Sequence, residues 1–231
     1  MRKVEFVNDE FYHIYSRGVD KRLIFLDDND RLRFVQGLYV FNDMNLIDKP
    51  FYYNFFKIVE RIKDNKRPLV DIVAWCLMPN HYHLLVKQLV DGGISKFINK
   101  LANSFTKYFN IKNDRSGYLF QGEFQAKHVD KDEYFNHVSC YVHVNHLELS
   151  EPDWKDKGVK DLKIARGFLV DYPWSSLRDY LGKKPSMFLP VINRDIIIDF
   201  FDGKPQNYSD FIDECLKQDA ARRLLGNFDF F

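Results

Sequence analysis

Residues 74–86 read AWCLMPNHYHLLV: an apolar run, a Pro-Asn turn, and a second apolar run that carries two histidines. Such a turn between two runs of strand-forming residues predicts a β-hairpin. Side chains in a strand alternate between its faces, so His81 and His83 should project to the same side, about 7 Å apart along the chain. Two imidazoles at this spacing can bind one metal ion. An isolated His-x-His pair is more often an ordinary part of a strand, so the assignment depends on the rest of the chain.

The hairpin lies within a mixed succession of strands and helices. Capping residues, strand-forming runs and apolar spacing predict a strand at 11–18, a helix at 27–42, the hairpin strands at 69–77 and 81–88, a helix at 94–109, one or two short strands within 118–129, and a helix at 131–146. This order favours an α+β sandwich in which helices back one antiparallel sheet.

Two segments interrupt or extend this pattern. Residues 43–68 mix aromatic residues, a proline and a basic cluster, which indicates an insertion that is partly helical at 55–62. Residues 150–167 are charged and contain glycine, which is typical of a linker. After them, residues 172–177 should form the start of a short helix, with a proline near its first position.

Composition limits the classes of protein that fit. The 231 residues carry 34 basic and 33 acidic side chains, so the net charge of +1 does not by itself favour nucleic-acid binding. Any DNA contact must come from a local basic face. The three cysteines, Cys76, Cys140 and Cys215, are far apart, which indicates neither a disulfide framework nor a thiolate zinc site and is consistent with a reducing cytoplasm. The sequence shows neither a signal peptide nor a membrane span, so we expect a cytoplasmic protein.

The helix predicted near residues 131–146 carries a polar ridge. Stepping by fours gives His137, Tyr141 and Asn145 on one face of an otherwise apolar helix. Tyr141 is a possible nucleophile because a phenol can attack phosphorus and hold the cleaved bond as a phosphotyrosine ester. His137 could serve as a general base or second-shell partner for it, although an ordinary core or surface histidine explains it as well.

If this helix covers the sheet face that bears the two histidines, His81, His83 and Asn145 supply three neutral metal ligands. A bound Mg²⁺ or Mn²⁺ would then keep its charge for polarising an anionic oxygen. The natural anion for such a site is a phosphodiester. Basic residues that could contact the phosphates of a DNA strand or hairpin, or could equally be solvated surface charges, are Arg17, Lys21, Arg22, Lys96, Lys100, Lys107, Arg115 and Lys127.

These motifs together resemble a known family. The run WCLMPNHYHLLV, with YVHVN downstream, is similar to the single-tyrosine HUH transposases and in particular to REP-associated tyrosine transposases. Further similar stretches are YHIYSRGVDKRLIF near the start, GYLFQGEFQAKHV before the ridge helix, and YPWSS after it, so the resemblance spans about residues 11–181.

The resemblance implies a role for each residue of the constellation. His81 and His83 would be the HUH metal ligands, Asn145 the third, amide ligand, and Tyr141 the nucleophile. It also implies a ferredoxin-like (RRM-like) sheet, dependence on Mg²⁺ or Mn²⁺, and cleavage of single-stranded DNA beside a hairpin to give a 5′-phosphotyrosine and a free 3′-hydroxyl. We accordingly interpret residues 1–149 as the nuclease domain and 150–231 as a helical C-terminal extension that could contact DNA.

One departure and several alternatives remain at this stage. The family commonly follows its amide with proline, whereas His146 follows Asn145 here, which would let the helix continue slightly. A rolling-circle initiator or relaxase shares the histidine strand but usually places its tyrosine differently. A catalytically idle hairpin-binding protein would keep the fold alone. The sequence is compatible with a monomer or a homodimer.

Overall fold

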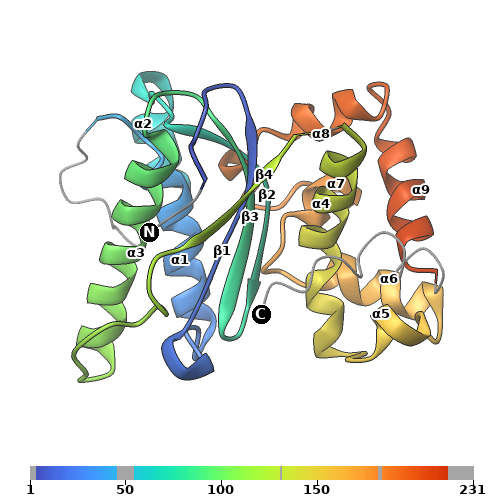
Figure 1. Ribbon diagram of the computed structural model, residues 1–231, viewed down its shortest axis with the longest axis horizontal. Coiled ribbons are helices and arrows are strands. Elements are labelled where there is room, and N and C mark those ends of the chain that lie inside the picture. Colours follow the sequence, from blue (N-terminus) through green and yellow to red (C-terminus); the bar gives the residue numbers. More distant parts are fainter. Residues whose placement is uncertain (1–3, 46–54, 131, 182–183, 218–231) are drawn as a thin grey trace. The chain divides into compact units, whose positions relative to one another are not determined.

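The structure is a computed structural model, and the residues that it describes are 4–45, 55–130, 132–181 and 184–217 (Figure 1). Tertiary contacts separate the chain into two compact units. The first comprises the chain up to Ile72 together with Met78–His128. The second comprises Val73–Leu77 together with the chain from Val129 onward, and thus contains the C-terminal helices.

The strands form one four-stranded sheet with the order β2-β3-β1-β4. They are β1 (Phe11–Arg17), β2 (Val70–Met78), β3 (His81–Gln88) and β4 (Gln125–Val129). β1 pairs with β3 in antiparallel register, with Tyr15 opposite His83. Because one helix follows β1 and another follows β3, the succession and the sheet order are those of a ferredoxin-like sandwich, which confirms the expected fold class.

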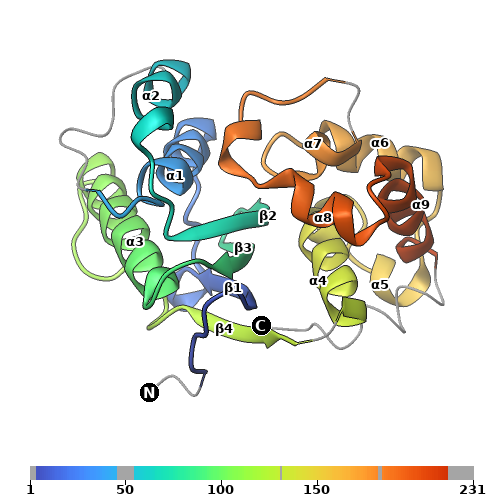
Figure 2. The ribbon, with the colours of Figure 1, turned by 90° about the horizontal axis from the view of Figure 1, so that it is seen from above.

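Two helices, α1 (Asp28–Val40) and α3 (Gly93–Lys112), run side by side along one face of this sheet (Figures 1 and 2). Aromatic rings form the core beneath them. The Phe34 ring centroid lies 5.1 Å from that of Phe105 and 4.9 Å from that of Tyr82 on β3. Tyr82 therefore faces the helices, and strand alternation turns His81 and His83 to the opposite face of the sheet.

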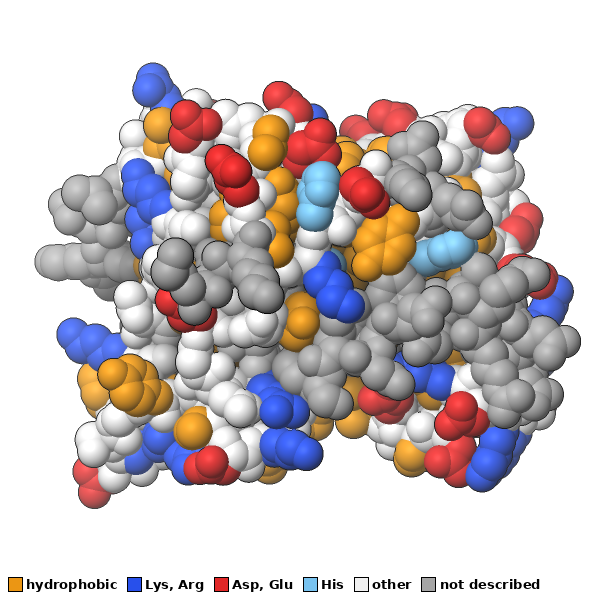
Figure 3. All heavy atoms as spheres, viewed as in Figure 1, with side chains coloured by type: hydrophobic (Ala, Val, Ile, Leu, Met, Phe, Trp, Pro, Cys, Tyr) orange, Lys and Arg blue, Asp and Glu red, His pale blue; other side chains and the backbone are white. Residues whose placement is uncertain are grey.

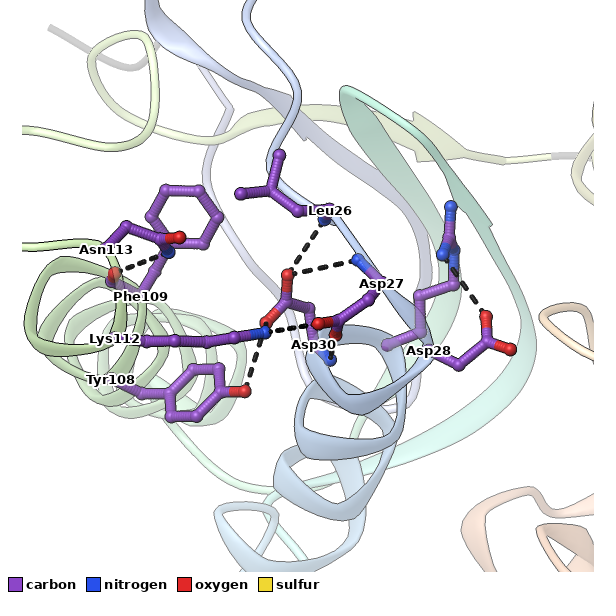
Figure 4. A network of polar contacts seen from close by, with 9 residues as sticks. Leu26, Asp27, Asp28, Asp30, Tyr108, Phe109, Lys112 and Asn113 are labelled. Carbon is purple, nitrogen blue, oxygen red and sulfur yellow. Dashed lines mark hydrogen bonds and ion pairs between the residues drawn. The ribbon is translucent and has the colours of Figure 1, made fainter.

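A buried carboxylate ties the start of α1 to the end of α3 (Figure 4). The Asp30 side chain is fully buried, and its Oδ1 lies 2.6 Å from Lys112 Nζ and 3.0 Å from Tyr108 Oη. Asp27, the N-cap of α1, accepts a hydrogen bond from the Asp30 N–H (3.0 Å) and pairs with Lys112 (2.7 Å). A buried charge is tolerated only when it is paired, so this network fixes how the two helices meet.

Replacing Lys112 by methionine should destabilise the first unit by about 2 kcal/mol. Asp30 would keep its hydrogen bonds from Tyr108 and from the Leu26 N–H, but it would lose its counter-charge. The free energy of unfolding, measured by urea titration, tests this. The matched control is Lys157→Met, which removes an exposed ion pair with Asp153 and should leave stability unchanged. Equal effects of the two substitutions would contradict the expected role of the network.

The same network predicts a pH dependence. The hydrogen bond from Lys112, helped by backbone donors, lowers the pKa of Asp27 below its usual value of 3.8. Burial opposes the charge of Lys112, but its hydrogen bonds to Asp27 and Asp30 outweigh burial and raise its pKa above 10.5. The stabilisation from Asp27 is present above pH 3.8 and is lost as the pH falls through its lower folded pKa. The stability difference between wild type and Lys112→Met should therefore shrink in acid.

The excursion before β2 is anchored by one buried asparagine. Asn42 Oδ1 accepts hydrogen bonds from the N–H groups of Leu69 (2.9 Å) and Val70 (3.0 Å), and its Nδ2 donates to Val70 O (2.7 Å). The predicted helix is present as α2 (Phe55–Ile62). Residues 46–54 of the predicted insertion lie outside the described residues.

The second unit is helical, as expected for the C-terminal part. Its helices are α4 (Asp132–Val144), α5 (Trp154–Lys157), α6 (Leu162–Asp171), α7 (Leu177–Leu181), α8 (Arg194–Phe200) and α9 (Pro205–Cys215). α4 packs against α8 and α9, and α7 packs against α6 and α9.

The segment YPWSS forms an extended pairing with the middle of β2. Leu77 N donates to Trp174 O (2.9 Å), and Ser176 N donates to Trp75 O (2.9 Å). The Tyr172 hydroxyl adds a hydrogen bond to Leu77 O (2.7 Å). Two sequence motifs a hundred residues apart thus form one backbone pairing within the second unit.

Two sequence-based expectations were wrong in detail. The stretch 150–167 is not a plain linker, because it holds α5 and the start of α6. No helix begins at 172, because those backbone groups pair with β2 instead, and α7 starts at Leu177. The expectation of one or two short strands within 118–129 is confirmed, since β4 occupies 125–129 and Phe120 makes a single bridge with Gly18.

Candidate nuclease site

The first part of the candidate site is the histidine strand. The ring centroids of His81 and His83 lie 5.0 Å apart with the ring planes at 87°. His83 is fully buried, whereas His81 is partly exposed. The structure thus brings together the two histidines that the sequence singled out, on one face of β3.

In both His81 and His83, the hydrogen bond engages ring nitrogen Nδ1 and leaves Nε2 as the second ring nitrogen. His81 Nδ1 lies 2.6 Å from Asn80 Oδ1, so Nδ1–H donates and Nε2 carries the lone pair. His83 Nδ1 lies 2.9 Å from His13 Nε2 on β1. Metal-binding histidines usually have their second nitrogen held in this way, which fixes the tautomer and the orientation of the ring.

His13, on the first predicted strand, was not among the site residues predicted from the sequence, yet it contacts His83. Its ring is fully buried and stacks on His83, with centroids 5.1 Å apart and planes at 19°. Burial, helped by the positive charge of Lys127, lowers the pKa of His13 to about 3. The ring is therefore neutral at physiological pH, so one of its nitrogens can accept a hydrogen bond. The signal for it was only its position on a strand, since the pairing depends on register.

The second part of the candidate site lies on α4 and the turn that follows it. Tyr141 is buried on α4, and Asn145 begins a 3-10 turn directly after α4 ends at Val144. The helix therefore does not continue through His146, contrary to the expectation from the missing proline. Asn145 Oδ1 is buried, and within the described part of the chain it has no hydrogen-bond partner. A buried amide oxygen without a donor is suited to binding a cation.

A cation lies over the ring of Tyr141. Lys155 Nζ is 5.1 Å from the ring centroid and also pairs with Glu148. Lys155 is a second residue that the sequence reasoning missed, because it lies on the short helix α5 within the stretch interpreted as a linker. A positive charge at this distance favours negative charge on the ring oxygen.

The other histidines near Tyr141 differ in their surroundings. His143 is engaged through both ring nitrogens, Nδ1 with Tyr208 Oη (2.6 Å) and Nε2 with Ser176 Oγ (2.8 Å). His146 Nε2 donates to Leu169 O (3.1 Å). Burial lowers the pKa of both to about 3, so they are neutral packing residues. His137 is half-buried and stacks on Phe211 of α9, with ring centroids 6.1 Å apart.

The donor set fits a hard divalent cation. Within the described residues, no three His, Cys, Asp or Glu side chains gather closely enough to hold a metal. An amide oxygen is another possible protein ligand, and Asn145 Oδ1 in the second unit is buried without a hydrogen-bond donor among the described residues. Imidazole with amide oxygen is an acceptable ligand set for Mn²⁺ and, with added water, for Mg²⁺.

Four of the basic residues predicted to contact DNA lie on α3 or in the loop that follows it. Arg115 donates to Asn110 Oδ1 (2.5 Å) and Tyr118 O (3.0 Å), and Lys100 donates to Asp43 O (2.8 Å), so both hold loops in place. Lys96 and Lys107 are exposed on α3 and make no ion pair within the described residues.

Three of the remaining four cations lie at or just after the end of β1, and Lys127 lies in the middle of β4. Arg17 donates to Gln121 Oε1 (2.7 Å), and Arg22 pairs with Asp20 (3.8 Å). Lys21 is exposed, and burial lowers the pKa of Lys127. Figure 3 shows Lys and Arg interspersed with Asp and Glu on the face drawn, as the near-zero net charge predicts.

The chain is an α+β protein with a ferredoxin-like sheet and a His-x-His strand. Comparison with known proteins shows which families share these features. Residues 41–145 match the family model described as "Transposase IS200 like". The match contains both histidines and Tyr141 and ends on Asn145. Over this segment, the sequence is similar to the IS200-like transposase family.

Among solved structures, a REP-associated tyrosine transposase bound to a REP hairpin shares the fold. The TM-score is 0.51 at 14% sequence identity, and the alignment covers 81% of this chain and 88% of that chain. No curated protein matches the chain significantly. Within the described residues, no helix is both long and apolar enough to span a membrane.

Proposed function

We propose that the chain is a metal-dependent, single-tyrosine transposase of the REP-associated type, which cleaves and rejoins single-stranded DNA beside a hairpin. The observation that carries this proposal is that the segment matching the family contains an oriented His81–His83 pair in the first unit, together with a buried Tyr141 and an unsatisfied Asn145 amide oxygen in the second. The hairpin partner is proposed because the solved transposase with this fold is bound to a REP hairpin.

The proposed reaction is a transesterification. Tyr141 Oη attacks phosphorus, so that a P–O bond to the tyrosine forms and the P–O3′ bond breaks. The products are a 5′-phosphotyrosine and a 3′-oxygen, which takes up a proton to become a 3′-hydroxyl. Lys155 above the ring would stabilise the phenolate that attacks, and His137, one helical turn away, would accept or relay the phenolic proton. His81, His83 and Asn145 would hold Mg²⁺ or Mn²⁺, which supplies charge that polarises the scissile phosphate. Attack by the 3′-hydroxyl on the phosphotyrosine reverses these steps and rejoins a strand.

The direct test is to incubate the protein with Mn²⁺ and a set of labelled single-stranded hairpin DNAs, and to look for a covalent adduct on a denaturing gel. We expect an adduct that depends on the metal and that forms on one side of the hairpin. Metal-independent binding of hairpins without any adduct would favour the idle DNA-binding alternative. An adduct on substrates without a hairpin would favour the initiator or relaxase alternative.

A mixing experiment asks whether one chain supplies all the groups. His81→Ala and Tyr141→Phe are each expected to be inactive. If a mixture of the two variants regains adduct formation, the active form is a homodimer in which one protomer supplies the metal ligands and its partner supplies the tyrosine. A mixture without activity indicates that each chain uses its own groups.

We further propose that His13 positions His83 for metal binding, because their hydrogen bond fixes which nitrogen of His83 carries the proton. His13→Leu should weaken Mn²⁺ binding about 10- to 100-fold, whereas His13→Gln, which keeps an acceptor, should restore much of it. Mn²⁺ titration followed by electron paramagnetic resonance measures this. Nitrogen NMR of the metal-free protein should show a changed His83 tautomer in His13→Leu only. Equal affinities in both variants would show that His13 merely packs.

A further inference from the structure

A cavity of about 930 Å³ lies in the first unit between α3 and the segment that precedes β4. α3 contributes Asn99, Asn103 and Thr106 to its lining, and the facing segment contributes Tyr118, Phe120 and Glu123. None of these residues belongs to the constellation proposed for DNA cleavage.

The loop wall of the cavity is held by backbone contacts. Val19 N donates to Leu119 O (2.9 Å) and Gln121 N donates to Arg17 O (2.8 Å), which fastens the loop to the end of β1. Gly122 has φ +67, a left-handed conformation that favours glycine at this bend. Backbone contacts therefore hold the loop that bounds one side of the cavity.

The helix wall offers uncommitted polar groups. Asn99 and Asn103 are exposed, lie one turn apart on α3, and make no side-chain hydrogen bond within the described residues. On the opposite wall, the Tyr118 side chain is 87% exposed. An aromatic ring on one wall and two amides on the other match a nucleobase, which stacks through its face and forms hydrogen bonds through its edge.

Charges at the cavity restrict the ligand further. The Glu123 carboxylate, which only accepts hydrogen bonds, repels a phosphate but accepts from an exocyclic amino group. Lys96 lies one turn before Asn99 and Lys107 one turn after Asn103 on α3, where they can contact phosphates outside the cavity. The cavity would therefore hold a base, and the two lysines outside it would contact the phosphates of the same DNA strand.

We propose that this cavity holds one unpaired nucleobase with an exocyclic amino group, from a DNA strand whose phosphates contact Lys96 and Lys107. The proposal rests on the proposed function in that DNA is the substrate. It adds a site of base selection within the first unit that is separate from the cleavage chemistry.

The test compares oligo(dC) and oligo(dU) of twelve nucleotides, which differ in the presence of the exocyclic amino group. Binding is measured by fluorescence anisotropy at pH 8 and low salt, with the full chain. We expect oligo(dC) to bind about tenfold more tightly than oligo(dU), and Glu123→Ala to bring the ratio of the two affinities close to one. Tyr118→Ala and the double variant Asn99→Ala/Asn103→Ala should weaken binding of both oligonucleotides by at least about fivefold.

Ser104→Ala, on the same helix but outside the cavity lining, is the matched control and should change neither affinity. Equal affinities of the wild type for the two oligonucleotides, or a preference that survives Glu123→Ala, would overturn the proposal. Weakening by Lys96→Ala and Lys107→Ala alone would show that only the phosphates are bound. Adduct formation is read separately: an intact cytosine preference without any adduct rejects the cleavage function but leaves the base site standing.

Discussion

Tyr141→Phe should abolish the covalent protein–DNA adduct while leaving the fold and DNA binding intact. The substitution removes only the phenolic oxygen, and Tyr141 is 3% exposed, so the packing of the ring is conserved. Without the oxygen no phosphotyrosine can form, and the loss of a nucleophile typically lowers a rate by several orders of magnitude. The measurement is adduct formation with labelled hairpin DNA in Mn²⁺.

The control for this experiment is Tyr134→Phe on the same helix. Tyr134 lies two turns before Tyr141 and is only half-buried, so removal of its hydroxyl should leave adduct formation unchanged. An adduct that persists in Tyr141→Phe would assign the nucleophile to another residue. Loss of hairpin binding along with the adduct would instead mean that the hydroxyl of Tyr141 is needed for DNA binding.

His83→Ala should abolish metal-dependent cleavage and lower Mn²⁺ affinity, with His81→Ala having the same direction of effect. Loss of one of two imidazoles from a site with few protein ligands removes much of the binding free energy of the ion. DNA binding should be largely preserved, because phosphate contacts rather than the metal supply most of the affinity for a nucleic acid. The two measurements are Mn²⁺ titration and anisotropy with the same hairpin DNA.

The matched control is His128→Ala. His128 lies on β4 of the same unit and forms an exposed ion pair with Glu10 (3.0 Å), so its replacement should affect neither metal affinity nor cleavage. His83 is also buried against His13, so part of any loss could come from packing. His81 is only partly exposed but lies at the end of the strand, which makes His81→Ala the cleaner substitution. Unchanged Mn²⁺ affinity in both variants would show that the histidines are structural.

The amino-acid sequence was sufficient for the elements that depend on local pattern. The alternation around His81 and His83, the Pro-Asn turn and the apolar spacing of α3 are properties of neighbouring residues, and the structure has each of them where the pattern predicts. Asp27 was likewise recognisable as the start of α1 because a capping side chain acts on residues only three positions away.

Local pattern was less informative where backbone partners come from far along the chain. The segment after Tyr172 has a proline near its start, as a helix often does, but its N–H and C=O groups pair with Trp75 and Leu77 instead. A helix was therefore expected where the backbone is extended. Similarly, Asn145 lies on the helical ridge in sequence, yet the backbone tightens to a 3-10 turn at this residue.

By itself, the sequence determined the succession of strands and helices, and it identified the histidine strand and the tyrosine helix, because each depends on periodicity and on residue type. The ferredoxin-like arrangement was implied only by the resemblance to a known family. Only the tertiary structure decided what surrounds these residues. The hydrogen bond between His13 and His83 joins residues 70 positions apart and exists because β1 and β3 pair in one register. Lys155 lies above Tyr141 because the chain turns back after α4. Contacts of this kind are set by how distant segments pack, and no local pattern encodes them.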